Sequence, residues 1–329
     1  MARPHFDLTA VEHDLRAIRD DLHCNVVRVS GGDPDRIEQA ASIAVDLGLD
    51  VWFSPYPLEA TDQQMLTLFA DCAERLRERG GQIVFVTGAE LSLMATGFLP
   101  GDTLEERMGL LGRPERVREL IGEVSANVNA FLAQSISAVR QHFNGPVTYA
   151  SIPLEQVDWT PFNIVSLDIY RSSAIADGFA ELFTTGMREL AGLGKPVAIT
   201  EFGTAGYRGA GDRGAQGLEI IEYDPQTRQA VRLNDAYERD EQAQATYLRE
   251  LLEVFETAGV DTAFVFIFAL YDLPHRPAGD PREDLDLASY GIVKILDSDP
   301  RGQTWEPKAA FTALAEHYGD LNSGPWIPK

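Results

Sequence analysis

Short apolar segments alternate with helical segments along the whole chain, and this alternation limits the possible folds more than any other feature. The apolar segments are at most eight residues long and are apolar on both faces. Parallel strands that are covered by helices have this pattern. The expected strands span residues 25–30, 50–55, 82–87, 146–151, 164–170, 196–203 and 262–269. The expected helices span residues 8–22, 34–47, 61–79, 116–142, 176–193, 239–258 and 306–318.

Two folds fit seven strands that alternate with helices. One is an open, doubly wound sheet, and the other is a (β/α)8 barrel in which one strand is weak or missing. The nucleotide-binding signatures GxGxxG and GxxxxGK[ST] follow none of the strands, which disfavours the open sheet. No low-complexity linker divides the chain. We therefore predict an α/β protein with a single (β/α)8 TIM-barrel domain over residues 1–329.

The weak or missing strand is expected at the amino terminus, because the chain opens with a helical segment at residue 8. The preceding residues, MARPHF, are too few and too polar to supply a convincing first strand. Either the natural chain extends further at this end, or the first part of the barrel is irregular.

Two connections are unusually long and follow strands that end close to a glutamate. They span residues 92–114 and about 204–238. The second contains the glycine-rich segment GYRGAGDRGAQG and then two alternating segments around Asp224 and Pro225, which predict a hairpin insertion. Loops of this length in a compact domain are usually functional or mobile. Both are therefore expected to border a site.

The two glutamates at these strand ends are Glu90, in TGAELS, and Glu201, in PVAITEFG. Active sites of barrels form at the carboxyl ends of the strands, so both side chains are expected in one pocket. Two facing carboxylates can cleave a glycosidic bond, with one as the proton donor and the other as the nucleophile. The alternative is that each glutamate only caps a helix or pairs with an arginine.

The chain resembles the large clan of retaining glycoside hydrolases with (β/α)8 barrels, which includes cellulases, mannanases and β-galactosidases. CNVVRVSGGDP, TGAELS, IVSLDIY, PVAITEFGTAG and AFVFIFALYD are similar to strands two, four, six, seven and eight of that clan. RDEQAQATYLRELLEVF, SYGIVK and TWEPKAAFTALAEHY resemble its closing segments. The resemblance extends almost end to end, apart from the first strand.

This resemblance implies a retaining double displacement with Glu201 as the nucleophile and Glu90 as the acid/base. It also implies that Arg28 supports the nucleophile and that the hydroxyl of Tyr170 approaches it. No cofactor and no metal are implied. The expected substrate contacts combine these two residues with aromatic and acidic residues near the strand ends. They are Arg28, Trp52, Tyr149, Tyr170, Phe268, Tyr271 and Asp272.

Two positions differ from the pattern of the clan. Ala89 stands where an asparagine usually precedes the acid/base, and Phe268 stands where a tryptophan usually forms the platform under the sugar. Three alternatives to ordinary hexose hydrolysis therefore remain for the function. The protein could hydrolyse an unusual glycoside, or it could catalyse a lyase, isomerase or cyclase reaction on a non-sugar substrate. It could also be a non-catalytic descendant that only binds a ligand.

Charge and composition narrow the range of partners. The chain has 51 acidic and 28 basic residues, a net charge of −23, which repels nucleic acids and anionic membranes. The sequence shows neither an apolar stretch long enough for a membrane span nor a secretory signal, so we expect a cytoplasmic protein. Cys24 and Cys72 form no disulfide framework, and the six histidines lack metal-site spacing. The expected partner is a small-molecule or oligosaccharide substrate, and no motif specifies an oligomeric state.

Overall fold

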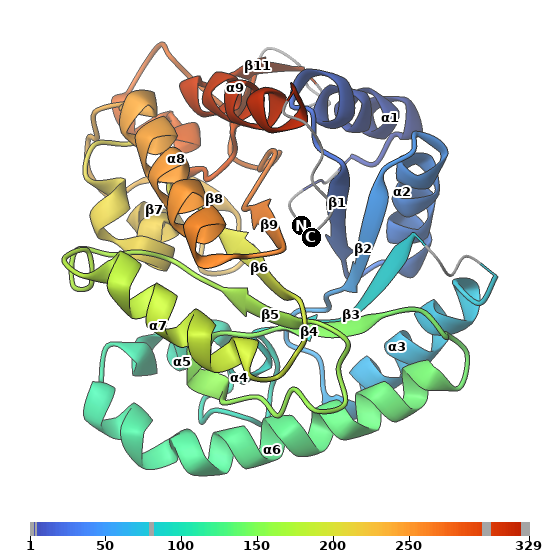
Figure 1. Cartoon of the computed structure of the whole chain (residues 1–329). Coiled ribbons are helices and arrows are strands. Elements are labelled where there is room, and N and C mark those ends of the chain that lie inside the picture. Colours follow the sequence, from blue (N-terminus) through green and yellow to red (C-terminus); the bar gives the residue numbers. More distant parts are fainter. Residues whose placement is uncertain (1–2, 4, 79–81, 298–303, 324–329) are drawn as a thin grey trace. The chain divides into compact units, whose positions relative to one another are not determined.

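Strands and helices alternate along the chain in a computed structural model that describes residues 3, 5–78, 82–297 and 304–323 (Figure 1). The residues group into two compact units. Unit 1 comprises Met1–Cys24, Ile169–Glu189 and Glu201–Lys329, and unit 2 comprises Asn25–Asp168 and Leu190–Thr200. The prediction of one domain over residues 1–329 stays a prediction.

All seven predicted strands are present. They are β1 (Val26–Gly31), β2 (Asp50–Pro55), β3 (Ile83–Ala89), β4 (Val147–Ala150), β5 (Val165–Asp168), β6 (Val197–Phe202) and β9 (Thr262–Val265). No strand precedes β1 in the described part of the chain, where the sequence indicated a weak or missing first strand.

Unit 2 contains a parallel sheet in the order β1-β2-β3-β4. A parallel bridge between Ser151 and Leu167 continues this arrangement from β4 to β5. The amide of Val165 then donates to the carbonyl of Pro196, beside the start of β6. Because these strands run in the same direction, their carboxyl ends share one edge, and Glu90 and Asp168 both lie at that edge.

Three long helices, α2 (Pro34–Asp46), α3 (Asp62–Arg75) and α6 (Pro114–Arg140), lie along the outer face of this sheet (Figure 1). Local sequence signals fix where the first two begin. Asp33 accepts hydrogen bonds from the amides of Asp35 and Arg36 at the start of α2. Thr61 and Gln64 form the capping box that opens α3.

Aromatic side chains fill the space between the sheet and these helices. Phe85 of β3 is fully buried and packs against Phe53, Phe69 and Phe143, with ring centroids 5.9–6.3 Å apart. The cluster joins β2 and β3 to the helical layer. Phe85 therefore lies at the centre of the contacts between these rings.

Replacement of Phe85 by alanine should lower the free energy of unfolding by about 3–5 kcal/mol, because it leaves a cavity among three aromatic rings. Urea denaturation followed by circular dichroism measures this change. The control is Leu182→Ala, which truncates a side chain that is 64% exposed and should change stability by about 0.5 kcal/mol or less. Equal midpoints for the two variants would contradict this description of the core.

Unit 1 contains the end of β6, strand β9 and two antiparallel pairs. The first pair, β7 (Ile221–Tyr223) with β8 (Ala230–Leu233), is the hairpin that the sequence predicted. The second pair is β10 (Val293–Ile295) with β11 (Trp305–Pro307). The helices of this unit are α1 (Leu8–Arg16), most of α7 (Phe179–Ala191), α8 (Glu241–Ala258) and α9 (Ala309–Ser323).

A close approach of two backbone segments follows β6. Any Cβ added to Gly203 would collide with the carbonyl of Phe266, just after β9. The amide of Phe266 also donates to the carbonyl of Phe202 at 2.8 Å. Glycine is therefore required in the TEFG segment for packing next to β9, independently of any role for Glu201.

Buried charges anchor the end of the long connection of residues 204–238. Arg239 donates to Asp284 and Asp286 at 2.8 Å each, and to His275 at 3.0 Å. The fully buried Lys308 forms an ion pair with Asp286 at 2.9 Å. This network joins the connection to the segment after β9 and to the start of α9.

Two parts of the sequence-based description need correction or extension, and a third lies outside the described residues. The helix predicted over residues 306–318 starts only at Ala309, because Trp305–Pro307 pairs with β10 as strand β11. The connection of residues 92–114 contains α5 (Leu104–Leu111), whose capping box at Thr103 and Glu106 was not used in the prediction. Residue 79, the predicted end of a helix, lies outside the described residues.

The remaining short helical elements are η1 (Ala17–Asp21), α4 (Leu91–Met94), η2 (Pro153–Glu155), η3 (Ala210–Asp212), η4 (Gly214–Ile220), η5 (Pro281–Glu283) and η6 (Leu285–Ala288).

No helix within the described residues combines the length and the apolar character that a membrane crossing requires.

Candidate active site

The backbone bends sharply at the end of β3, and this bend places Glu90. The register of β3 against β4 shifts between Val86 and Ala89, which marks a bulge. Gly88 lies in this bulge with φ of +91°, a conformation that favours glycine. Glu90 follows with φ 44° and ψ 45°, in the left-handed region. Such a residue costs about 1–3 kcal/mol and persists only where its surroundings fix it, often at a functional site. Bulges next to active sites redirect side chains in this way.

Three consecutive amides fix the backbone at Glu90. The amide of Glu90 donates to the carbonyl of Ala150 at 2.9 Å. The amide of Leu91 donates to the hydroxyl of Tyr149 at 2.7 Å, and that of Ser92 donates to a carboxylate oxygen of Glu155 at 2.8 Å. All three acceptors belong to β4 or to the segment that follows it. The strained turn is therefore held against the neighbouring strand at every residue.

Tyr149, which the sequence predicted to contact the substrate, is fully buried. Its hydroxyl accepts from Leu91 and donates to Glu155 at 2.7 Å. Burial, with the negative charge of Glu155 as a second cause, raises the pKa of Tyr149 well above its ordinary value of 10. The structure thus places this hydroxyl behind the turn at Glu90, and its predicted contact with substrate stays a prediction.

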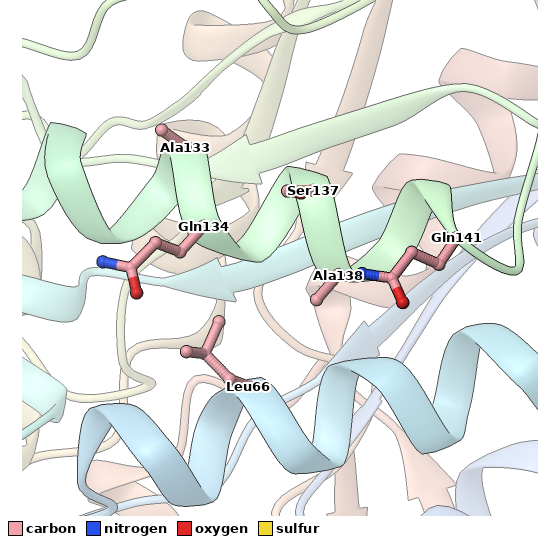
Figure 2. Close-up of a pocket in the computed structure, with 6 residues that line it drawn as sticks. All are labelled: Leu66, Ala133, Gln134, Ser137, Ala138 and Gln141. Atoms are coloured by element: carbon pink, nitrogen blue, oxygen red, sulfur yellow. The ribbon is translucent and has the colours of Figure 1, made fainter.

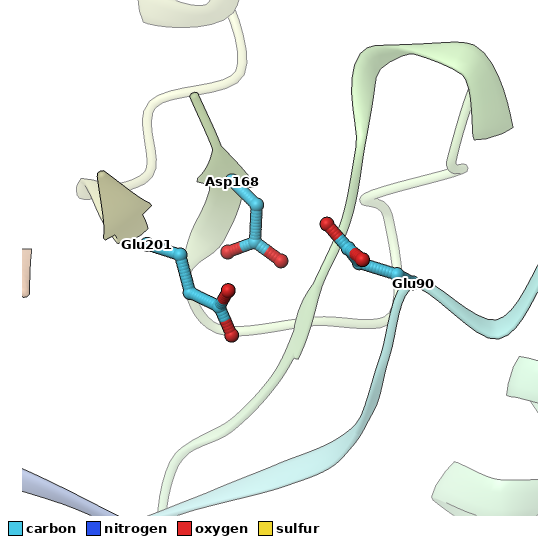
Figure 3. Close-up of side chains that lie close together, drawn as sticks. All are labelled: Glu90, Asp168 and Glu201. Atoms are coloured by element: carbon cyan, nitrogen blue, oxygen red, sulfur yellow. The ribbon is translucent and has the colours of Figure 1, made fainter. Parts of the chain in front are cut away.

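Asp168, at the end of β5, lies beside Glu90. Its side chain is buried, and a carboxylate oxygen of each residue lies within 4.8 Å of the other. Figure 3 shows the two carboxylates directed toward one another, and it also labels Glu201 of unit 1. The expectation that no metal is needed stays a prediction.

Glu201 lies at the end of β6 and is partly buried. The hydroxyl of Tyr170 donates to one of its carboxylate oxygens at 3.2 Å, a contact that the sequence predicted. The amide of Ile169 donates to the carbonyl of Glu201 at 2.8 Å and fixes its backbone. The ring of Tyr170 is itself held edge-on against Tyr290, with centroids 6.1 Å apart. The carboxylate is therefore oriented by a side chain that packing immobilises.

Arg28, on β1, supports the residue before the glutamate. It donates to the hydroxyl of Ser54 on β2 at 3.3 Å and to the carbonyl of Thr200 at 3.2 Å. Thr200 directly precedes Glu201 in the chain. Trp52, the neighbour of Arg28 on β2, is buried with 4% of its surface exposed. The roles predicted for Arg28 and Trp52 toward the substrate stay predictions.

Three further predicted contacts follow β9. Phe268 is partly exposed, and its ring meets Trp305 at right angles, 5.4 Å between centroids. The hydroxyl of Tyr271 donates to Asp14 at 2.5 Å, and the guanidinium of Arg3 lies 4.3 Å from the ring centre. Asp272 is exposed. Tyr271 thus binds residues of the amino-terminal segment, and the substrate-binding role of all three stays a prediction.

Sequence reasoning missed Glu155, which is fully buried and accepts from Ser92, Tyr149 and Ser151 at 2.7–2.9 Å. Burial raises the pKa of its carboxyl above the ordinary 4.5, although the hydrogen bonds act in the opposite direction. No motif marks it in SIPLEQVD. Asp168 had a signal, since it is an acidic residue within an otherwise apolar strand, IVSLDIY.

A surface depression of about 450 Å³ lies elsewhere in unit 2, between α3 and α6. Figure 2 shows Leu66 on α3, Gln134 and Ala138 on α6, and Gln141 at the carboxyl end of α6 around it. None of the predicted site residues lines this depression.

The fold is similar to that of solved glycoside hydrolases. A GH113 β-1,4-mannanase matches with a TM-score of 0.60 and 14% identity, over 94% of this chain and 93% of that one. A GH113 β-mannanase from Alicyclobacillus acidocaldarius, in complex with ManMIm, matches with 0.59 and 15%, over 98% and 95%. A GH5_18 protein from Streptomyces cattleya, in complex with Manβ1-4GlcNAc, matches with 0.57 and 14%, over 98% and 78%.

No protein-family model and no curated protein matches the chain. At 14–15% identity, the structural likeness establishes the fold alone. The sequence predicted an α/β fold of the (β/α)8 barrel type and a resemblance to glycoside hydrolases. Both predictions are confirmed at the level of the fold, and the low identity shows that the chain is divergent.

Proposed function

We propose that the protein is a glycosidase that cleaves a glycosidic bond with retention of configuration. The observation that carries this proposal is the orientation of Glu201 by the Tyr170 hydroxyl at the end of a strand. Glu90, held in a strained conformation at the end of β3, supports it. The similarity of the fold to mannanases and to a GH5_18 protein gives the proposal its reaction class.

The proposed mechanism divides the reaction between the two glutamates. The carboxylate of Glu201 attacks the anomeric carbon while Glu90 donates its proton to the leaving oxygen. Glu90 then removes a proton from water, which attacks the same carbon and releases Glu201. This sequence requires a separation of about 5–5.5 Å between the two carboxyl groups, whereas inversion would require about 6.5–9.5 Å.

Tyr170 and Arg28 complete the proposed nucleophile site. The Tyr170 hydroxyl donates to the carboxylate of Glu201 and limits its rotation. Arg28, on β1, fixes the carbonyl of Thr200, the residue before Glu201. No cofactor and no metal enter this mechanism.

Replacement of Tyr170 by phenylalanine should lower kcat roughly 10- to 100-fold, because a hydrogen bond to a charged group contributes about 1.5–3 kcal/mol. Steady-state kinetics on an aryl glycoside measure the effect. The matched control is Tyr318→Phe on α9, a helix that carries none of the proposed site residues, and it should leave kcat unchanged. Equal kcat values for both variants would show that Tyr170 does not orient the nucleophile.

The substrate class is proposed from the neighbours, which include β-1,4-mannanases. We therefore place β-linked mannosides first in a panel of aryl glycosides, followed by β-glucuronides, because β-glucuronidases also match the fold. Proton NMR of the first product formed distinguishes the two stereochemical outcomes. Release of the β-anomer from a β-glycoside supports the proposal, and release of the α-anomer contradicts it.

A second candidate is an enzyme of another class, such as a lyase, isomerase or cyclase. The observations that favour it are Ala89 and Phe268, which replace the asparagine and tryptophan of the clan pattern. A non-catalytic protein that binds a ligand is the third candidate. Absence of turnover across the whole glycoside panel would favour these two over the glycosidase. The location in the cytoplasm and the exclusion of nucleic acids and membranes as partners stay predictions.

A further inference from the structure

We propose that Glu155 is a positioning residue for Glu90, which it holds in place through the two amides that follow Glu90 in the chain. The inference rests on the proposed function, in which Glu90 is the acid/base. Glu155 itself touches neither Glu90 nor the proposed substrate in this mechanism. It acts through Ser92 and through the hydroxyl of Tyr149.

The contacts form two parallel links from Glu155 to the turn. One carboxylate oxygen accepts from the amide of Ser92 at 2.8 Å. The other accepts from Tyr149 at 2.7 Å, and the hydroxyl of Tyr149 in turn accepts from the amide of Leu91 at 2.7 Å. The hydroxyl of Ser151 donates to the same oxygen as Tyr149, at 2.9 Å. A single buried carboxylate thus organises both amides.

These amides need partners because of where they lie. Leu91 and Ser92 open α4, which has only four residues, and the first amides of a helix have no partner within it. Both side-chain acceptors are fully buried, so water does not replace them at low cost. If either link is lost, the left-handed conformation of Glu90 loses part of the support that offsets its strain.

A carboxylate suits this role better than an amide. It only accepts hydrogen bonds, and here three donors converge on it. Glutamine at this position would still accept from Ser92, but its amino group would replace the oxygen to which the hydroxyls of Tyr149 and Ser151 donate. We therefore expect Glu155→Gln to weaken one link, Tyr149→Phe to remove the other acceptor, and Glu155→Ala to remove both.

The consequence for the reaction is a displaced proton donor. A misplacement of about 1 Å can cost roughly 100-fold in rate. Protonation matters most for a poor leaving group, so the effect should depend on the substrate. For a phenyl glycoside we expect kcat/KM, which reports the first step, to fall roughly 10- to 100-fold in Tyr149→Phe and Glu155→Gln, and further in Glu155→Ala. For a dinitrophenyl glycoside we expect a loss in kcat/KM of about threefold or less, because its leaving group needs little protonation in that step.

The experiment compares these variants with two matched controls on the full-length protein. Ser135→Ala removes a buried hydrogen bond within α6, and Glu123→Gln removes an exposed charge from the same helix. Both should leave the ratio of the two kcat/KM values unchanged. If Glu155 had a merely structural role, its loss would reduce the amount of active enzyme. The measured rates on both substrates would then fall by the same factor. Equal losses on the two glycosides, or no loss at all in a folded variant, would overturn the proposal.

Hydrogen exchange tests the same positioning without reference to activity. We expect the amides of Glu90, Leu91 and Ser92 to exchange at least roughly tenfold faster in Tyr149→Phe and Glu155→Gln than in the wild type, while β1 and β2 keep their protection. Unchanged exchange at these three amides would refute the positioning role. If the wild type hydrolyses no glycoside, the proposed function fails, and exchange still decides whether Glu155 holds this turn.

Discussion

Glu201→Gln should abolish turnover and leave the fold intact. The variant retains an oxygen that can accept from Tyr170, but it lacks the negative charge that attacks the anomeric carbon. We expect kcat to fall by a factor on the order of 10⁴ or more, as for other enzymes that lose their nucleophile. Steady-state kinetics on the best glycoside of the panel measure this loss, and the urea midpoint measures the fold.

The control for this variant is Glu253→Gln, which removes an exposed charge from α8 in the same unit. It should retain wild-type kcat and stability. Activity close to that of the wild type in Glu201→Gln, in a protein that unfolds at the same urea concentration, would refute Glu201 as the nucleophile.

Glu90→Gln should separate substrates by their leaving groups. General acid catalysis contributes roughly 10²–10⁴ in rate, so kcat on a phenyl glycoside should fall within that range. A dinitrophenyl glycoside needs little protonation when it departs, so its first step should be nearly unaffected. Its second step also uses Glu90, as the base that activates water. The glycosyl-enzyme should therefore accumulate, and a burst of dinitrophenol should precede a slow steady state.

Glu123→Gln is the control for Glu90→Gln as well, because both substitutions remove one carboxylate from unit 2. The control should show neither the burst nor the dependence on the leaving group. If Glu90→Gln reduced kcat by the same factor on both substrates, with no burst, Glu90 would not be the acid/base.

The sequence predicted the features of this fold that depend on short-range patterns. The apolar segments located all seven strands. Two predicted helices begin next to Asp33 and at the pair Thr61–Gln64, because such caps bond to amides within one turn. The hairpin around Asp224 was predictable for the same reason. β10 and β11 were missed, because each has only three residues and depends on a partner distant in the sequence.

The site was predictable only in part. The position of Glu201 and its contact with Tyr170 followed from the strand ends and from the resemblance. Strand alternation indicates which face a side chain occupies but not its partner, and Tyr149 was therefore expected at the substrate although its hydroxyl meets Leu91 and Glu155. The left-handed conformation of Glu90 depends on a bulge in the pairing of β3 with β4, which no local pattern reveals.

Chemical trapping tests the proposed double displacement most directly. The wild type is incubated with a 2-deoxy-2-fluoroglycosyl fluoride of the sugar that the panel selects, and its peptides are analysed by mass spectrometry. The account predicts one added glycosyl group on the carboxylate of Glu201, with loss of activity in proportion to labelling. A label on Glu90 or Asp168 instead, or full labelling without loss of turnover, would contradict it.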